Sequence, residues 1–265
     1  MRIVVPMKQV PETNAVRMDE ATGTMIREGV EAIVNPLDLY AIELAIRLRD
    51  RHGGRVSVVS MGPPGAMRAL REAIAMGCDS AVLLSNKSFA GSDTWATSHV
   101  LAAALTRLDG FDLVICGERA TDGDTGQVGP GLAAFLDLPV ATYVSAVEEI
   151  SSSEVRVRRV VEDGYEVLLL KLPAVLTVVK EIGEPRLPTL AGKRRARKID
   201  IPTWSPLDIG VESEKVGLTG SPTRVVKIFR PKIARAGRKL VAGDEVRLRQ
   251  AVDELVAFLK DRQLL

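Results

Sequence analysis

The fold is decided by residues 113–131, which read Leu-Val-Ile-Cys-Gly-Glu-Arg-Ala-Thr-Asp-Gly-Asp-Thr-Gly-Gln-Val-Gly-Pro-Gly. The apolar start, Leu113–Cys116, predicts a short buried strand. A turn with five glycines follows, and it leads into helix-compatible sequence at roughly Thr125–Leu136. A strand that passes through a glycine-rich turn into a helix is typical of parallel sheets, which bind ligands beyond the carboxyl ends of their strands.

The same strand, turn and helix pattern repeats from residue 1 to about residue 140. Further strands are expected at Ile3–Pro6, Arg55–Ser60 and Ser80–Leu84. Helices are expected after Asn35, which can cap the helix that starts at Pro36, and at Gly65–Met76 and Ser92–Leu108. This alternation predicts an α/β fold with a doubly wound, mostly parallel sheet.

The pattern changes after residue 140. Extended segments at Val155–Val161, Val167–Leu172 and Val175–Val179 predict a small antiparallel appendage. Residues 181–241 contain six prolines and little periodicity, which predicts an extended arm laid on a partner. Helical spacing returns at Gly243–Leu264. We therefore expect three parts: a nucleotide-binding domain with the appendage at 1–180, the arm at 181–241 and a C-terminal helix at 242–265.

Composition excludes several classes of protein. The chain has 265 residues, of which 46% are hydrophobic and 26% charged, so it can bury a core and is not disordered. Two cysteines without CxxC spacing and two histidines argue against a zinc site. The formal net charge is only +2, so the chain has no overall positive potential of the kind that attracts nucleic acid. The sequence shows neither a secretory signal nor an apolar run long enough to span a membrane, so we expect a cytoplasmic protein without membrane insertion.

The glycine-rich segment Gly117–Gly131 is the first candidate site. Its glycines let backbone N–H groups approach a ligand, and with the Thr125 hydroxyl they could hold a pyrophosphate. A glycine-rich surface turn explains the spacing equally well. Asp122 and Asp124 could hold a ribose or cap the helix. The loops at 35–38, 60–64 and 91–97 are expected at the same edge of the sheet, which favours one nucleotide pocket.

A basic run at Lys193–Lys198 is the second candidate. Positive charge of this density binds nucleic acid, anionic lipid or an acidic protein surface, or it forms a solvated loop. Nucleic acid is disfavoured because no aromatic platform or recognition helix accompanies the run. Neither His52 nor His99 has a nucleophile nearby in sequence, so no hydrolytic triad is visible.

Two further stretches read Val-Arg-Arg-Val-Val-Glu-Asp-Gly-Tyr-Glu at Val157–Glu166 and Lys-Leu-Pro-Ala-Val-Leu-Thr at Lys171–Thr177. With this signature the chain resembles, along nearly its whole length, the β subunit of electron-transfer flavoproteins. Asn35-Pro36, Met61-Gly62-Pro63 and Asp122–Pro130 fall where this family binds an adenine nucleotide. Glu118–Thr121 departs from the family pattern, which more often has Gln before the alanine, so Arg119 is expected either to pair with phosphate or to face water.

The resemblance implies a heterodimer with an α subunit that carries its own FAD. One branch of the family keeps AMP in the β subunit. The electron-bifurcating branch holds a second FAD there and oxidises NADH, with electrons passing to the α-subunit FAD and to a low-potential acceptor such as ferredoxin or flavodoxin. This chain looks more like the bifurcating branch because of Asp122–Thr125 with Val128–Pro130, Gly91–Thr97 and Gly220–Thr223. An acyl-CoA dehydrogenase or a quinone-linked protein is the implied partner.

The loops and the resemblance together give the expected site residues. Expected to bind the cofactor, FAD or in the alternative AMP, are Pro6, Asn35, Pro36, Leu37, Asp38, Met61, Gly62, Thr94, Thr97, Arg119, Ala120, Asp122, Gly123, Asp124, Thr125, Gly126, Gln127, Val128 and Gly129. The family's recognition loop for partner dehydrogenases matches residues 188–197, and its expected contacts are Leu190, Lys193, Arg194, Arg195 and Arg197. No side chain is expected to act as an acid or base, and no metal is expected. A different class, an ATP-binding α/β domain of stress-protein type, leaves the segment 181–241 unexplained.

Overall fold

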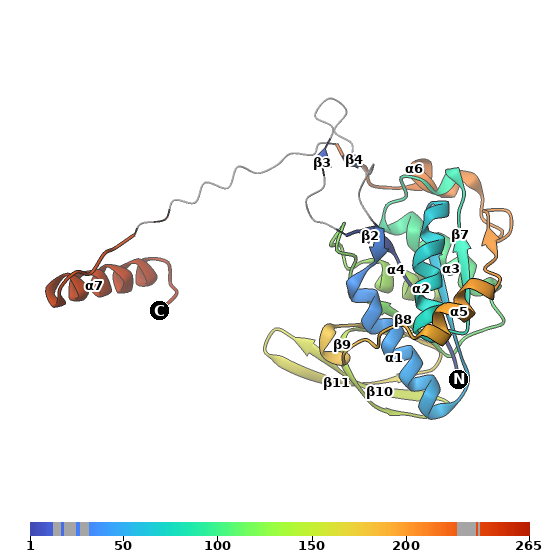
Figure 1. Ribbon diagram of the computed structural model, residues 1–265, viewed down its shortest axis with the longest axis horizontal. Coiled ribbons are helices and arrows are strands. Elements are labelled where there is room, and N and C mark those ends of the chain that lie inside the picture. The colour runs from blue at the N-terminus through green and yellow to red at the C-terminus, as the bar shows by residue number, and fades with distance from the viewer. Residues whose placement is uncertain (13–16, 19–24, 27–31, 227–236, 238) are drawn as a thin grey trace. The chain divides into compact units, whose positions relative to one another are not determined.

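The computed structural model describes residues 1–12, 17–18, 25–26, 32–226, 237 and 239–265. The chain divides into two compact units, Met1–Val226 and Lys227–Leu265, which are described separately. The first unit contains the sheet and the helices that cover it (Figure 1).

The central sheet has nine strands in the order β11-β10-β9-β12-β8-β1-β6-β7-β13. In the run β9-β12-β8-β1-β6-β7-β13, each strand is parallel to the next one. The predicted strands are confirmed as β1 (Arg2–Pro6), β6 (Arg55–Met61), β7 (Ser80–Leu84) and β8 (Leu113–Gly117). Their burial on both faces explains why they read as continuous apolar runs. The doubly wound α/β class is confirmed.

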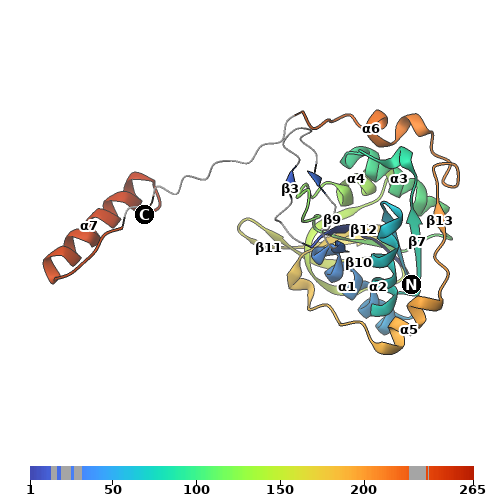
Figure 2. The same ribbon diagram turned by 45° about the horizontal axis from the view of Figure 1, so that its top comes forward.

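Helices cover both faces of the sheet (Figure 2). Helices α1 (Pro36–His52) and α2 (Met67–Met76, after the short η1, Pro64–Ala66) pack on one face through a core that includes Ile42, Leu70 and Ile74. Helices α3 (Thr94–Arg107) and α4 (Val128–Leu136) pack on the other through Val100, Leu105 and Leu132. A further short turn, η2 (Lys87–Phe89), precedes α3. The expected helices are confirmed, although α4 begins three residues later than predicted.

The chain reverses direction across the sheet between β1 and β8. From β1 it passes through α1 to β6 and then β7, and it returns through α3 to β8 on the opposite side of β1. Such a switch point leaves a crevice at the carboxyl ends of the two strands, where open α/β sheets bind their ligands. The loops after β1 and β8 therefore form the edge at which a ligand is expected.

The antiparallel appendage is confirmed in part. β10 (Glu154–Val161) and β11 (Gly164–Lys171) form a hairpin, and β9 (Val140–Ile150) pairs antiparallel with β10. The third segment was assigned wrongly: β12 (Ala174–Val178) lies inside the main sheet, parallel to both β8 and β9. All five of its residues are buried, so its apolar run marks a central strand. β9 itself was not expected.

Part of the segment 181–241 packs on this chain's own domain. After η3 (Lys180–Ile182), helix α5 (Leu190–Lys198) lies on α2, in place of the loop expected at 188–197. β13 (Thr203–Trp204) adds an edge strand beside β7, and η4 (Ser213–Lys215) and α6 (Gly217–Gly220) follow. Thr189 accepts a hydrogen bond from the Gly192 N–H and so caps α5, a signal that the basic run obscured.

Smaller elements complete the described chain. β2 (Gln9–Pro11) pairs with β5 (Ala32–Val34), and β3 (Arg17–Met18) pairs with β4 (Met25–Ile26). The second unit contains α7 (Glu245–Asp261), where a C-terminal helix was expected, and Asp244 caps it by accepting from the Arg247 N–H. No helix of the described residues is long and apolar enough to cross a membrane.

Candidate functional site

The glycine-rich segment lies at the switch point and is tied to its surroundings by side chains from other loops. The Lys8 ammonium, just after β1, forms an ion pair with Asp122 at 2.7 Å. At the far end of the segment, the Thr94 hydroxyl donates to Gln127 Oε1 at 2.8 Å. Two hydrogen bonds of Asn35 add the 35–38 loop, so the structure brings together three of the loops that the sequence placed at one edge: 35–38, 91–97 and 117–131.

Asn35 is the buried link between two of these loops. Its side chain is not the helix cap that we expected. Its Nδ2 group donates to the Arg119 carbonyl at 2.9 Å, and its Oδ1 accepts from the Thr121 N–H at 3.1 Å. With the residue only 1% exposed, this amide satisfies two backbone groups of the glycine-rich segment. Pro36 at the helix start leaves one fewer N–H to cap, so the amide can serve the neighbouring loop.

Asp38 is buried in the first turn of α1, directly behind the segment. Its Oδ2 accepts a 2.7 Å hydrogen bond from the Lys8 N–H. Burial raises the pKa of this carboxyl to about 7, although that hydrogen bond and Asn35 lower it. Asp38 faces Gly117 so closely that a β-carbon there would overlap the carboxylate and the Leu37 carbonyl. Asp38 and Leu37 thus brace the start of the glycine-rich segment.

The five glycines of this segment fall into two groups. A β-carbon at Gly117, Gly129 or Gly131 would collide with Asp38, Thr177 or Ser98 respectively. Gly117 therefore lets the end of β8 approach the start of α1, Gly129 lets α4 approach β12, and Gly131 lets α4 approach α3. At Gly123 a β-carbon would meet nothing within 4 Å, and at Gly126 it would lie 3.5 Å from the Glu118 carbonyl oxygen. Gly123 and Gly126 therefore leave the middle of the segment open.

A run of backbone donors occupies this open part. Within the described residues, no acceptor is found for the N–H groups of Thr125, Gly126, Gln127, Val128 and Gly129. The last two begin α4, where the helix dipole also favours negative charge. Gly129 is buried and Gly126 and Val128 are half-buried, whereas Thr125 and Gln127 are exposed. Unpaired N–H groups that are withdrawn from water at a helix start suit an anionic ligand.

Three other charged side chains of the segment, Glu118, Arg119 and Asp124, are paired with one another. Arg119 contacts Asp124 at 2.8 Å and Glu118 at 3.4 Å, and it is 46% exposed. Exposed pairs of this kind contribute about 0–1 kcal/mol. The backbone, rather than a lysine or arginine, therefore supplies the donors that have no partner. Ala120 accepts two backbone hydrogen bonds from Gly123 and Asp124, which close the turn.

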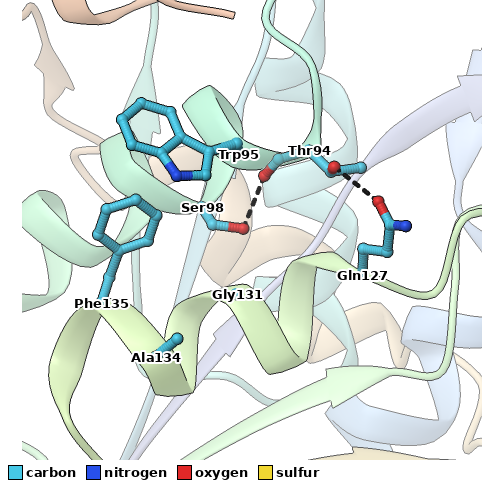
Figure 3. A pocket seen from close by; sticks show the side chains of 7 residues that line it. All are labelled: Thr94, Trp95, Ser98, Gln127, Gly131, Ala134 and Phe135. Carbon is cyan, nitrogen blue, oxygen red and sulfur yellow. Dashed lines mark hydrogen bonds between the residues drawn. The ribbon is translucent and has the colours of Figure 1, made fainter. Parts of the chain in front are cut away.

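An open pocket of about 340 Å³ adjoins the segment between α3 and α4 (Figure 3). Thr94 and Gln127 form its polar end, while Trp95 and Phe135 form an aromatic wall with centroids 5.2 Å apart. Ser98 donates to the Thr94 carbonyl at 2.7 Å and fixes the wall of α3. Thr97 lies one turn along the same helix, and its N–H bonds the Asp93 carbonyl.

The remaining predicted site residues lie along the strand ends. Pro6 is buried at the end of β1 and pairs with Val59. Met61 ends β6, and the Gly62 N–H bonds the Leu84 carbonyl. Gln9 Nε2 donates to the Gly65 carbonyl at 3.2 Å, which links the 61–64 loop to the chain after β1. No group of three or more His, Cys, Asp or Glu in the described residues could hold a metal ion.

The predicted partner residues lie on α5, away from the glycine-rich segment. Leu190 is 78% exposed, and Lys193, Arg194 and Arg197 are exposed as well. Arg195 differs, because its guanidinium donates to the Ile74 carbonyl at 2.8 Å and to the Cys78 carbonyl at 2.7 Å. These bonds occupy Arg195 in holding α5 on the end of α2.

Sequence reasoning missed Lys8, which pairs with Asp122, and also Tyr143 and Thr177. Thr177 is buried in β12, and its hydroxyl accepts from the Tyr143 N–H at 3.1 Å. Tyr143 has φ of 57°, which no local pattern in the sequence signals. A third contact was also missed: Asp93 accepts bonds from both the N–H and the hydroxyl of Thr223.

Comparison with known proteins identifies the family. Residues 22–209 match the family described as "Electron transfer flavoprotein domain". The chain belongs to the electron transfer flavoprotein family. Its similarity is to β subunits of that family: it is 46% identical to the electron transfer flavoprotein subunit beta of Thermoanaerobacterium thermosaccharolyticum, over 100% of both chains. Electron transfer is thus its general function.

Two further relatives of this electron transfer flavoprotein chain carry more specific names. The caffeyl-CoA reductase-Etf complex subunit CarD of Acetobacterium woodii is 45% identical over 100% of both chains. The protein FixA of Azorhizobium caulinodans is 41% identical over 99% of this chain and 95% of its own. The resemblance inferred from the sequence alone is confirmed.

Proposed function

We propose that this chain is the β subunit of a heterodimeric electron transfer flavoprotein of the electron-bifurcating type, with FAD in the site at the switch point. The observation that carries the nucleotide site is the run of unpaired N–H groups from Thr125 to Gly129, beside the open glycines Gly123 and Gly126. Such a run fits the pyrophosphate of a dinucleotide. Bound FAD would supply acceptance of hydride from NADH and transfer of single electrons onward.

The chain's own residues would bind and orient the cofactor. The N–H groups from Thr125 to Gly129 donate to the phosphates, and Asn35 fixes the shape of the segment that presents them. The loops at 35–38 and 61–64 provide the side of the crevice nearer β6. No acid or base is required of the protein, because the cofactor performs the chemistry.

The choice of the bifurcating type rests on three segments, 91–97, 122–130 and 220–223, which hydrogen bonds link in the structure. Asp93, in the 91–97 segment, binds Thr223, while Thr94 in the same segment binds Gln127. The pocket between α3 and α4 adjoins this side at Thr94 and Gln127. A relative named for a caffeyl-CoA reductase-Etf complex adds support.

The cofactor content of the purified heterodimer tests this proposal. We expect two flavins for each pair of subunits, and bleaching of the visible spectrum by NADH. One flavin and one AMP would instead indicate a β subunit with a structural nucleotide, the alternative within the family. ATP bound to the chain without any flavin-containing partner would favour an ATP-binding domain of stress-protein type.

We further propose that α5 recognises a partner dehydrogenase that acts on acyl-CoA. Leu190 is a large apolar side chain at the start of a helix whose remaining exposed residues are mostly cationic. Such a surface suits a transient contact, in which the leucine fills a pocket and the charge steers an acidic partner. The relative in the complex with a CoA-ester reductase supports this class of partner.

The variant Leu190→Ala tests the recognition surface. We expect electron transfer to the dehydrogenase to fall by roughly tenfold, or about 1.4 kcal/mol if the loss is in binding. Cofactor content and NADH-driven flavin reduction should stay unchanged. Leu207→Ala is the matched control, since Leu207 is 90% exposed and lies outside α5. Equal losses in both variants would contradict the assignment of Leu190.

We propose that the C-terminal part of the chain, after residue 226, contacts the α subunit. In α7, Leu248, Val252 and Leu255 repeat at helical spacing and are each at least half exposed. An apolar stripe of this kind suits packing against another protein. Limited proteolysis tests this: residues after 226 should be cut more slowly when the α subunit is present, and equal rates would contradict it.

A further inference from the structure

We infer that the hydroxyl of Tyr143 binds a phosphate of the nucleotide, as a donor that supplements the backbone N–H groups. The inference rests on the proposed nucleotide site and adds a side chain to it. A β-carbon placed at Gly126 would lie 3.9 Å from the Tyr143 hydroxyl. That hydroxyl therefore stands beside the middle of the unpaired run Thr125–Gly129. Within the described residues it has no hydrogen-bond partner of its own.

The backbone at Tyr143 is held in an unfavourable conformation. The pairing of β9 with β12 shifts register between Leu176 and Val178, and Tyr143 lies in the resulting bulge with φ of 57°. Glycine is the usual residue for a left-handed position in a bulge, because it lacks the β-carbon that crowds the backbone. A large aromatic residue here is strained, and such strain is found mostly where function requires it.

Packing does not account for the tyrosine. The residue is 43% exposed, so its ring adds little to the core. Its N–H is fixed by the Thr177 hydroxyl, and the methyl group of the same threonine lies under Gly129. Thr177 thus sets the distance between the bulge and the start of α4. The result of this arrangement is a phenol hydroxyl beside Gly126, in the middle of the unpaired run.

Affinities for AMP and for adenosine isolate the phosphate contact. The full chain, purified with its co-expressed α subunit and stripped of β-site nucleotide, is titrated with each compound. Tyr143→Phe keeps the ring and removes only the hydroxyl. We expect AMP affinity to fall about tenfold to a hundredfold, the usual range for one hydrogen bond to a charged group. Adenosine affinity should not change. Tyr165→Phe, on the appendage, is the matched control, with both affinities expected to match the wild type.

A second variant separates binding from stability. Tyr143→Asn replaces the residue with one that tolerates a left-handed backbone. We expect the Tm of the nucleotide-free protein to rise by about 2–4 °C while AMP affinity falls. A residue retained for stability alone would give a lower Tm.

The outcomes distinguish two failures. Wild-type AMP affinity in Tyr143→Phe would overturn the role of Tyr143 and leave the nucleotide site intact. Equal losses of AMP and adenosine affinity in that variant would also overturn it, because they would indicate a disturbed site. Absence of AMP and FAD binding by the wild type would overturn the proposed function, and the role of Tyr143 with it.

Discussion

The ends and the middle of the glycine-rich segment use the same residue type for opposite reasons. At the ends, Gly117, Gly129 and Gly131 are required because neighbouring residues leave no space for a β-carbon. In the middle, Gly123 has open space beside it, a β-carbon at Gly126 would make only ordinary contacts, and the N–H groups around these two residues lack acceptors. The ends are therefore part of the fold, and the middle is the part that can meet a ligand.

This difference changes how a substitution must be interpreted. From the sequence, a bulky residue at Gly129 is expected to block the approach of phosphates to the backbone. In the structure the same change would push into Thr177, so any loss of nucleotide would follow from damage to the fold. Only substitutions in the middle of the segment test binding directly.

The largest effect is expected for Gly129→Val. The added side chain would overlap the buried Thr177 methyl, and we expect destabilisation of about 4 kcal/mol or more. Urea unfolding measures the free energy. Gly129→Ala combined with Thr177→Ser, which removes the obstructing methyl, should recover part of the loss seen in Gly129→Ala alone. A stable Gly129→Val protein that merely lacked nucleotide would break the comparison.

The next largest effect is on the pH dependence of the free energy of unfolding. Asp38, which contacts Gly117, contributes this dependence. Its pKa is about 7 in the folded chain against a usual 3.8, so the folded state holds an extra proton between these values. The contribution of Asp38 to the free energy of unfolding is therefore greatest below about pH 4, and it declines as the pH rises to about 7.

Asp38→Asn removes this titration and keeps an acceptor for the Lys8 N–H. We expect the free energy of unfolding of the wild type, relative to Asp38→Asn, to fall by about 2–4 kcal/mol between pH 4 and pH 8. Denaturant unfolding at several pH values measures this. Asp112→Asn is a control at an exposed strand start, where Asp112 accepts from the Arg2 N–H. A difference that did not change with pH would contradict the buried carboxyl.

Asn35→Ala tests the link between the 35–38 loop and the glycine-rich segment. The change leaves the Arg119 carbonyl and the Thr121 N–H without their partner, at a cost of about 2 kcal/mol. Hydrogen exchange should accelerate most at residue 121. Asn86→Ala, which removes an exposed amide that accepts from the Ser88 N–H, should cost less. Uniform acceleration along the chain would show general destabilisation instead.

The smallest effects on stability are expected in the middle. Gly126 has φ of 64°, so Gly126→Ala should cost about 1 kcal/mol from backbone strain alone. Gly123→Ala has open space and should stay within about 0.5 kcal/mol of the wild type. Thermal unfolding without nucleotide gives both values. A cost at Gly123 as large as at Gly129 would remove the distinction between the two groups.

The sequence was sufficient for features that depend on local pattern. The strand and helix units up to residue 140 follow from apolar periodicity and from turn residues, and the position of the glycine-rich segment follows from them. It was insufficient where the outcome depends on a distant partner. Asn35 looks like a helix cap because local rules assign it to its own helix, whereas its partners lie 84 and 86 residues away.

The same limit applies to β12 and to α5. An apolar run of five residues predicts a strand but not its neighbours, so β12 was placed beside the hairpin that precedes it in sequence. The basic helix α5 has little apolar character, and its attachment depends on Arg195 reaching two carbonyl groups of the α2 end. Tyr143 was invisible because no local pattern signals a left-handed aromatic residue.

The position of β12 also has a consequence for the order in which the protein is made. β12 lies between β8 and β9, yet it is synthesised after both of them. Until residue 178 has left the ribosome, β8 has an open edge, and Gly129 and Tyr143 lack the threonine that fixes them. A nascent chain that stops before this strand therefore presents an unpaired apolar edge to chaperones and to other chains. The nucleotide site is completed only when this late strand inserts.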